Sequence, residues 1–330
     1  MTALKAGNYA PVYLLMGQEP YYIDAVTDFI QSNALDEMAR EFDQTIIYGK
    51  DVQSIDSVIN AAKRFPMMGQ RSVIIVKEAQ NIKDWADLVY YLQQPQPTTV
   101  LVFCYKYGTM NANTKVFKEI DRQGVVLKSE PIRDSQIPQW INDYVRAKQI
   151  SIEPKAVQML AEHLGADLAK IVAELDKLIL NKPESGTITA ALVESNVGIS
   201  KDYNTFELFS AIANHDILKA NRITYYFAAN QKEHPIQMVV PQLFGFFANL
   251  MMYHYLPSKE SRYAAQELHI NPYFIRDYEQ AARHYSPMHT MQIIGYLRET
   301  DARSKGVGDS NSDSLHLYQE LMYKILHKVY

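Results

Sequence analysis

A glycine and a glutamate stand where the first predicted strand of the chain passes into a helix, a position at which many α/β proteins bind phosphate. Residues 11–17 form a short apolar run, and Glu19-Pro20 opens an amphipathic segment. A phosphate loop of the form GxxxxGK[ST] supplies a lysine for the β- and γ-phosphates and a hydroxyl for magnesium. The turn Gly17-Gln18-Glu19-Pro20 has neither, and Glu19 would repel a phosphate. We therefore predict a degenerate nucleotide site that binds no nucleotide.

Two further positions that carry catalytic groups in nucleotide-hydrolysing domains hold other residues here. The strand expected over 72–76 continues into Lys77, whereas an ATPase places acidic residues there to hold magnesium and orient water. Tyr105 and Lys106 follow the strand expected over 98–103, where a polar sensor would stand. The histidines are scattered, and none has metal-ligand spacing to a cysteine or carboxylate. We expect no catalytic residue, no metal and no cofactor.

The stretch FPMMGQRSVIIV, residues 65–76, places three large apolar side chains on a turn between a helix and a strand. A proline after Phe65 ends the preceding amphipathic helix, and Gly69 lets the chain turn into four consecutive β-forming residues. Phe65, Met67 and Met68 then lie on a short corner. Two interpretations are open: these side chains fold back into their own core, or they insert into an apolar pocket of another protein.

The elements that would position these residues alternate between strands and helices. Strands are predicted over residues 11–17, 42–48, 72–76, 98–103 and 125–127. Helices are predicted from Pro20 onward and over residues 52–63, 85–92, 113–121 and 135–148. Alternation of this kind predicts a parallel sheet with helices on both faces.

From about residue 150 no further strand pattern appears, and the chain is predicted to be helical to its end. Gly165 closes one helix, Asp167 caps the next and Thr189 caps a third, which together indicate a small helical module. Further helices are predicted over residues 206–213, 217–230, 235–255, 261–268, 272–285, 287–304 and 313–330. The segment 237–255 is apolar on nearly all sides, so it should be central or covered by neighbouring subunits.

Composition restricts the class of protein. The 330 residues, 47% hydrophobic and 21% charged, fit a soluble protein of two or three domains. The net charge of −4 argues against strong binding of nucleic acid by this chain alone. The N-terminus lacks the pattern of a signal peptide, so we expect a cytoplasmic protein with no membrane partner. Cys104, the single cysteine, lies in VLVFCY and is expected to be a small buried hydrophobe.

Four motifs, in their order and spacing, resemble one family. They are YLLMGQEPYYID, FPMMGQRSVIIV, GADLAKIVAELDKLIL and DYNTFELFSAI. The family is the delta subunit of the bacterial DNA polymerase III clamp loader. The near-terminal DARSKGVGDSNSDSLHLYQEL is similar to the family's lysine-glycine turn between its last two helices, so the resemblance spans essentially the whole chain.

The resemblance implies an α/β plus all-α protein. An AAA+-like parallel-sheet domain without a nucleotide site is expected over residues 1–140, a small helical lid over 141–203 and a helical collar for oligomerisation over 204–330. The chain would be a subunit of the DNA polymerase III holoenzyme, a DNA-directed DNA polymerase, and would have no catalytic activity of its own. The implied partners are the sliding clamp (beta subunit), other clamp-loader subunits through the collar, and primed DNA within the assembled complex.

The resemblance also assigns residues. The family's clamp-gripping pair is two adjacent hydrophobic residues just before the glycine-containing turn, which here are Met67 and Met68, with Phe65 beside them. Family members often have Leu-Phe or Met-Phe there, so Met68 replaces a common aromatic. Gly17, Glu19 and Lys77 then mark the degenerate, non-binding nucleotide site. A divergent ATPase and a helical adaptor unrelated to replication are the alternatives.

Overall fold

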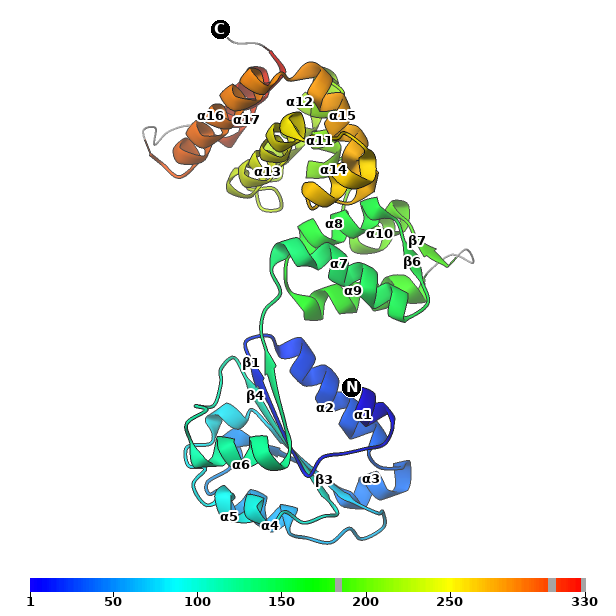
Figure 1. The fold of residues 1–330 in the computed structure, drawn as a ribbon, viewed down its shortest axis with the longest axis vertical. Coiled ribbons are helices and arrows are strands. Elements are labelled where there is room, and N and C mark those ends of the chain that lie inside the picture. The colour runs from blue at the N-terminus through cyan, green and yellow to red at the C-terminus, as the bar shows by residue number, and fades with distance from the viewer. Residues whose placement is uncertain (182–185, 308–312, 328–330) are drawn as a thin grey trace. The chain divides into compact units, whose positions relative to one another are not determined.

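The computed structural model of the chain describes residues 1–181, 186–307 and 313–327. The chain forms two compact units, Met1–Arg133 and Asp134–Tyr330. The first unit combines a sheet with helices, and the second is mainly helical (Figure 1). The finer division of the helical part into a lid and a collar stays a prediction.

A five-stranded parallel sheet forms the centre of the first unit. Its strands lie in the order β2 (Gln44–Tyr48), β3 (Ser72–Lys77), β4 (Thr99–Lys106), β1 (Val12–Gly17) and β5 (Val125–Ser129). Leu101 of β4 is in register with Ile74 on one side and with Val12 on the other. The apolar runs of β1, β3 and β4 are buried, as expected for parallel strands covered on both faces.

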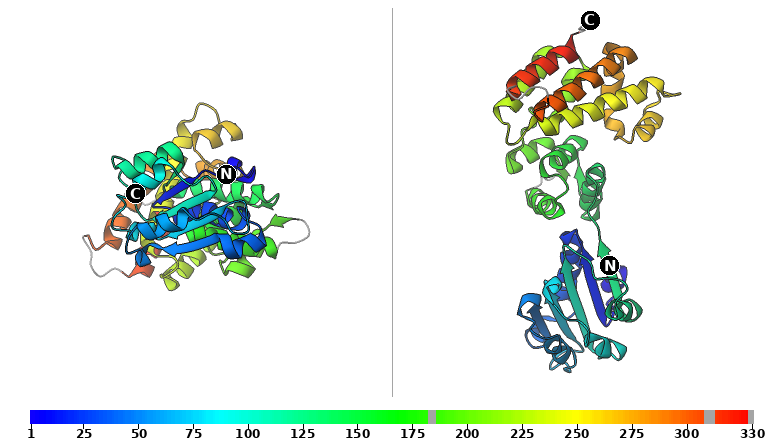
Figure 2. Two further views of the ribbon diagram at one scale, coloured as in Figure 1. Left: turned by 90° about the horizontal axis from the view of Figure 1, so that it is seen from below. Right: turned by 90° about the vertical axis from the view of Figure 1, so that its left-hand side faces the viewer.

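Helices cover both faces of this sheet, as predicted (Figures 1 and 2). On one face lie α1 (Thr2–Lys5), α2 (Pro20–Asn33) and α3 (Glu37–Asp43), with a core that includes Leu4, Ile23, Ile30 and Ala39. On the other lie α4 (Asp56–Ala62), α5 (Leu88–Gln93) and α6 (Lys115–Gln123), with a core that includes Val58, Leu88, Leu92 and Ile120. Cys104 is buried in the first core, as predicted, and burial raises the pKa of its thiol to about 11.

The region around β2 differs from the prediction. Residues 42 and 43 are predicted to lie in a strand, but they form the last turn of α3, a helix that the sequence pattern did not reveal. The side chain of Asp36 caps this short helix by accepting a hydrogen bond from the N–H of Ala39 (2.8 Å). The chain passes through the 3₁₀ turn η1 (Gly49–Asp51), and the helix predicted over 52–63 begins only at Asp56, after four residues that belong to no helix.

The second unit starts with η3 (Asp134–Gln136), α7 (Ile137–Ala147), α8 (Pro154–Leu164), α9 (Leu168–Leu180) and α10 (Ala190–Val197). The predicted N-caps are confirmed: Asp167 accepts from the N–H of Lys170, and Thr189 from the N–H of Leu192. The prediction that no strand follows residue 150 is wrong, since β6 (Ser151–Ile152) pairs in parallel with β7 (Thr187–Ile188). Two residues per strand are too few to produce a detectable alternation.

The remaining described residues form a bundle whose helix order agrees with the prediction. Its helices are α11 (Thr205–Ala213), α12 (Ile217–Ala229), α13 (Ile236–Tyr255), α14 (Ser261–Glu267), α15 (Ile275–His284), α16 (Pro287–Ser304) and α17 (Ser314–Leu326), with η4 (Pro272–Phe274) before α15. They share one apolar core, which includes Leu243, Phe247, Tyr285 and Tyr318. Residues 328–330, predicted to be helical, lie outside the described part of the chain. So do residues 308–312 of the turn that resembles the family's.

Helix α13 contains no Asp, Glu, Lys or Arg and packs along α16 in this unit, which agrees with the prediction that it is central. It buries one side through Val239, Leu243, Phe247 and Leu250, and it exposes Met238, Phe244, Met252 and Tyr255. Among the described helices it alone is long and apolar enough to cross a membrane. Core helices of soluble proteins meet the same criterion, so this property is weak evidence for a membrane span.

Candidate protein-binding site

The corner between α4 and β3 exposes its three large apolar side chains. Phe65, Met67 and Met68 are 76%, 78% and 58% exposed. Of the two interpretations left open by the sequence, burial in the chain's own core does not hold in this structure. Full burial of a side chain of this size is favourable by about 1.5–3 kcal/mol, so the corner is suited to contact another protein.

The carboxylate of Asp43, the last residue of α3, holds the backbone of the corner. It accepts hydrogen bonds from the N–H groups of Met67 (2.5 Å), Met68 (2.9 Å) and Gly69 (2.6 Å). Burial raises the pKa of this carboxyl, but the three N–H groups outweigh that effect and hold the pKa below its ordinary value. The ionised carboxylate therefore fixes the backbone from which the two methionines project.

Contacts on either side of the turn brace the corner further. A β-carbon at Gly69 would lie 3.0 Å from Cβ of Ala39 and 3.3 Å from Oδ2 of Asp43, so the turn lies directly on α3. At the entrance to β3, the guanidinium of Arg71 lies over the ring of Tyr9, 4.6 Å from its centroid. The corner is thus attached to α3 at its tip and to the N-terminal segment at its exit.

A second exposed apolar pair, which the sequence pattern does not indicate, lies beside the corner. Met38 and Phe42 of α3 are 69% and 56% exposed. They are four residues apart and share one side of the helix, next to the row of Ala39 and Asp43 that faces the corner. The strand predicted over 42–48 places Phe42 in the sheet, so the sequence did not indicate that Met38 and Phe42 lie on one helix. Asp36, which caps α3, is the signal that would have indicated the helix.

Charged side chains flank these apolar groups unevenly. Lys63 and Arg64 are exposed immediately before the corner, at the end of α4. Glu37 and Glu41 are exposed on α3. The surface is therefore basic where the chain enters the corner and acidic along α3, an asymmetry that can orient a charged partner.

The turn after β1 closes against the end of β5. The N–H of Gln18 donates to the carbonyl of Ser129 (3.0 Å), and the hydroxyl of Ser129 donates to the carbonyl of Glu19 (2.8 Å). A β-carbon at Gly17 would lie 1.9 Å from the carbonyl oxygen of Ser129, so this position requires glycine. The carboxylate of Glu19 accepts from the N–H of Tyr21 (2.9 Å) at the start of α2, where a nucleotide-binding protein would hold phosphate.

The lysines at the ends of two strands are also consistent with a degenerate nucleotide site. Lys106, at the end of β4, forms an ion pair with Asp24 of α2 (2.7 Å). Lys77 ends β3, where its ammonium group cannot act as a metal ligand. Within the described residues, no group of three or more His, Cys, Asp or Glu side chains is placed to hold a metal ion. That this position binds no nucleotide stays a prediction.

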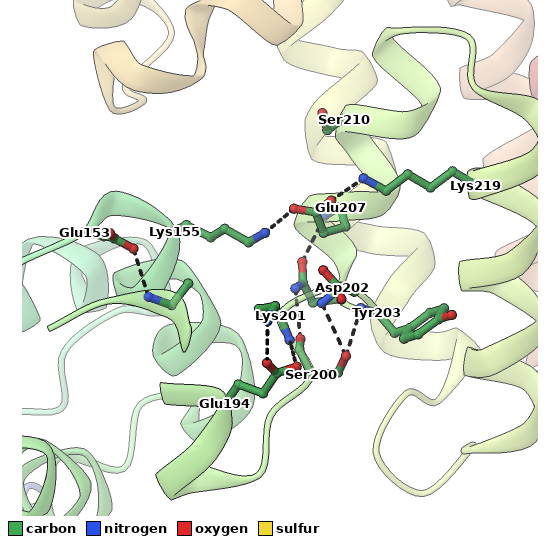
Figure 3. A network of polar contacts seen from close by, with 12 residues as sticks. Glu153, Lys155, Glu194, Ser200, Lys201, Asp202, Tyr203, Glu207, Ser210 and Lys219 are labelled. Carbon is green, nitrogen blue, oxygen red and sulfur yellow. Dashed lines mark hydrogen bonds and ion pairs between the residues drawn. The ribbon is translucent and has the colours of Figure 1, made fainter. Parts of the chain in front are cut away.

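In the second unit, ionisable side chains attach the start of α11 to α8 (Figure 3). Glu207 of α11 accepts from the ammonium groups of Lys155 in α8 and Lys219 in α12. Burial raises the pKa of Glu207, but the two ammonium groups outweigh it and hold the pKa below the ordinary value. The hydroxyl of Thr205 donates to Glu162 of α8, and burial raises the pKa of that carboxyl to about 7.

The fold and these sites define a protein with a parallel-sheet α/β unit, whose turn after β1 is closed by Ser129, and a second, mainly helical unit. Two family models match the chain: "DNA polymerase III, delta subunit" over residues 13–130 and "DNA polymerase III delta subunit, C-terminal domain" over residues 202–323. The chain belongs to the DNA polymerase III delta-subunit family. The resemblance stated from its motifs is thereby confirmed.

Individual proteins agree with this assignment. The chain is 24% identical over 315 residues to DNA polymerase III subunit delta of Bacillus subtilis. The aligned region covers 92% of this chain and 90% of that protein. The structure of the Bacillus subtilis DNA clamp loader delta protein has the same fold, with a TM-score of 0.52, 22% identity and 98% of both chains covered. Thermotoga maritima RuvB, a Holliday junction branch migration motor, has a TM-score of 0.38 and 12% identity over 86% of this chain and 82% of its own, too low to support an inference.

Proposed function

We propose that this chain is the clamp-loader subunit that binds the sliding clamp, the beta subunit, and opens its ring for loading onto primed DNA. The observation that carries the proposal is the exposed corner of Phe65, Met67 and Met68 on a backbone fixed by Asp43. Met67 and Met68 enter an apolar pocket of the clamp, and Phe65 covers its rim. Occupation of the pocket stabilises the opened interface of the ring.

The free energy available from burying the two methionines shows that other groups must contribute to clamp binding. Burial of the two methionines contributes about 3–6 kcal/mol before any cost of association. A micromolar complex requires about 8 kcal/mol net of the entropy lost on binding. Other groups must therefore contribute, and Gln70 and Arg71, directly after the corner, are proposed to do so.

Control of the corner has to come from other subunits, because this chain is proposed to bind no nucleotide. Residues 204–330 form the collar that assembles with related subunits in the cytoplasm, and the uncharged exposed side of α13 supports such packing. ATP bound by neighbouring subunits then shifts the assembly between two arrangements with different affinity for the clamp. Within this chain, the links from Glu207 to Lys155 and from Thr205 to Glu162 connect the collar with residues 141–203.

The proposal is tested by titrating this chain with the sliding clamp of the same organism in the absence of nucleotide and of other subunits. We expect a complex with a dissociation constant of about 1 μM or tighter, because the corner is exposed in the free chain. Dyes placed across one clamp interface should separate when the chain is added, which reports opening of the ring. Absence of binding, both alone and with the other loader subunits present, would contradict the proposal and favour an unrelated helical adaptor.

A titration with ATP and magnesium is expected to give no saturable binding and no change in the melting temperature of this chain. The physical reason is that the carboxylate of Glu19 occupies the start of α2 and the turn is closed by Ser129. A loader subunit with a complete phosphate loop provides the positive control. Saturable binding here would revive the divergent ATPase.

A further inference from the structure

We propose that Met38 and Phe42 form a second anchor for the sliding clamp, the α3 anchor, which enters an apolar hollow separate from the one that takes Met67 and Met68. The inference rests on the proposed function and adds a contact outside the corner. It assigns to the clamp surface two apolar hollows, side by side, in place of one.

The α3 anchor and the corner belong to one rigid surface. Asp43 is the last residue of α3, and its carboxylate binds the N–H groups of Met67, Met68 and Gly69. Gly69 also lies against the side chain of Ala39. Helix α3 and the loop from α4 to β3 are found at the same end of the sheet (Figure 1). A partner bound at the corner therefore lies beside α3.

The two side chains of the α3 anchor are suited to contact with another protein. Met38 and Phe42 lie one helical turn apart with 69% and 56% of their surface in water, and neither is part of the two cores of the fully described first unit. Phenylalanine is rigid and methionine adaptable, which suits both to fill a pocket on another protein. Their burial gives the clamp complex apolar contact that the two corner methionines alone do not supply.

The order of the charged residues around the two anchors fixes the orientation of the partner. Lys63 and Arg64 precede the corner, and Glu37 and Glu41 flank the α3 anchor. A clamp surface that fits both anchors has acidic groups beside the first hollow and basic groups beside the second. The reversed orientation brings like charges together at both ends and is disfavoured.

The test compares clamp affinity of the native chain with that of Met38→Ala/Phe42→Ala. We expect a loss of at least tenfold, with an unchanged melting temperature and unchanged hydrogen exchange at the N–H groups of Met67, Met68 and Gly69. Those N–H groups report whether Asp43 still holds the corner. The single variant Phe42→Glu, which adds a charge without opening space inside the chain, should weaken the complex similarly. Tyr90→Ala is the matched control, because Tyr90 is 74% exposed on α5, on the other face of the sheet.

The outcomes separate this inference from the proposed function. If the α3 variants bind as the native chain does while Met67→Ala/Met68→Ala binds weakly, the second anchor is overturned and the corner stands. If the α3 variants alone are weak, the α3 anchor stands and the role of the corner is overturned. If the native chain does not bind the clamp, both are overturned.

Discussion

Replacing Met67 and Met68 together with alanine is expected to weaken binding to the sliding clamp by roughly a hundredfold or more. Both side chains are largely exposed in the free chain, so most of their favourable burial would arise on binding. The lower end of the 3–6 kcal/mol available to the pair, about 3 kcal/mol, already corresponds to that factor. The measurement is a calorimetric titration of the clamp with the native chain and with the double variant.

The melting temperature and a matched pair of methionines serve as controls for this prediction. Exposed side chains contribute little to folding, so the double variant should melt as the native chain does. Met288 and Met291, 66% and 59% exposed on α16, provide the comparison, and Met288→Ala/Met291→Ala should leave clamp affinity unchanged. Native affinity in the corner variant with an unchanged melt would place the clamp contact elsewhere on the chain.

Local signals were sufficient to predict the corner and the sheet, because the residues that specify them are close together in sequence. A proline, a glycine and a run of β-formers mark the turn at residues 65–76. The apolar runs of β1, β3 and β4 are the continuous kind that buried parallel strands require. Asp167 and Thr189 cap the helices that follow them, as expected from residue type and position.

The features that the sequence did not reveal depend on contacts between distant residues or on very short elements. Asp43 holds N–H groups that lie 24 to 26 residues later in the chain, and no local pattern indicates such a pairing. Gly17 is required because of a carbonyl at Ser129, at the end of another strand. Helix α3 has seven residues, so its periodicity is weak, and the strand predicted over 42–48 includes the last two residues of this helix. Because so short a helix is not predicted, the exposed pair Met38 and Phe42 is not predicted either.

Asp43→Asn is expected to lower both the free energy of unfolding, by about 2 kcal/mol, and the affinity for the clamp, by about tenfold. Hydrogen bonds to an ionised group contribute about 1.5–3 kcal/mol, and an amide has only one oxygen to accept from the three N–H donors of the corner. Its NH₂ group would face an N–H donor, so the backbone at Met67 and Met68 should lose its fixed direction. Urea unfolding and clamp titration measure the two effects.

Asp36→Asn is the matched control, since it makes the same chemical change at the other end of α3. Asparagine caps a helix about as well as aspartate, so this variant should retain nearly native stability and clamp affinity. A similar loss in both variants would mean that the effect at Asp43 comes from α3 as a whole. The corner would then not depend on the Asp43 carboxylate.

The pH dependence of the unfolding free energy tests whether the charge of Asp43, and not only the shape of its side chain, stabilises the corner. Its pKa in the folded chain lies below the ordinary value, so the charge contributes stability that is fully present above the unfolded pKa, about 3.9. That contribution is lost as pH falls through the folded pKa, because the protonated carboxyl cannot serve the three N–H donors. The difference in unfolding free energy between the native chain and Asp43→Asn should therefore be constant from about pH 6 to 8 and shrink below about pH 4. If the difference instead stays constant throughout acid unfolding, the corner is held by packing on α3, with no role for an ionised carboxylate.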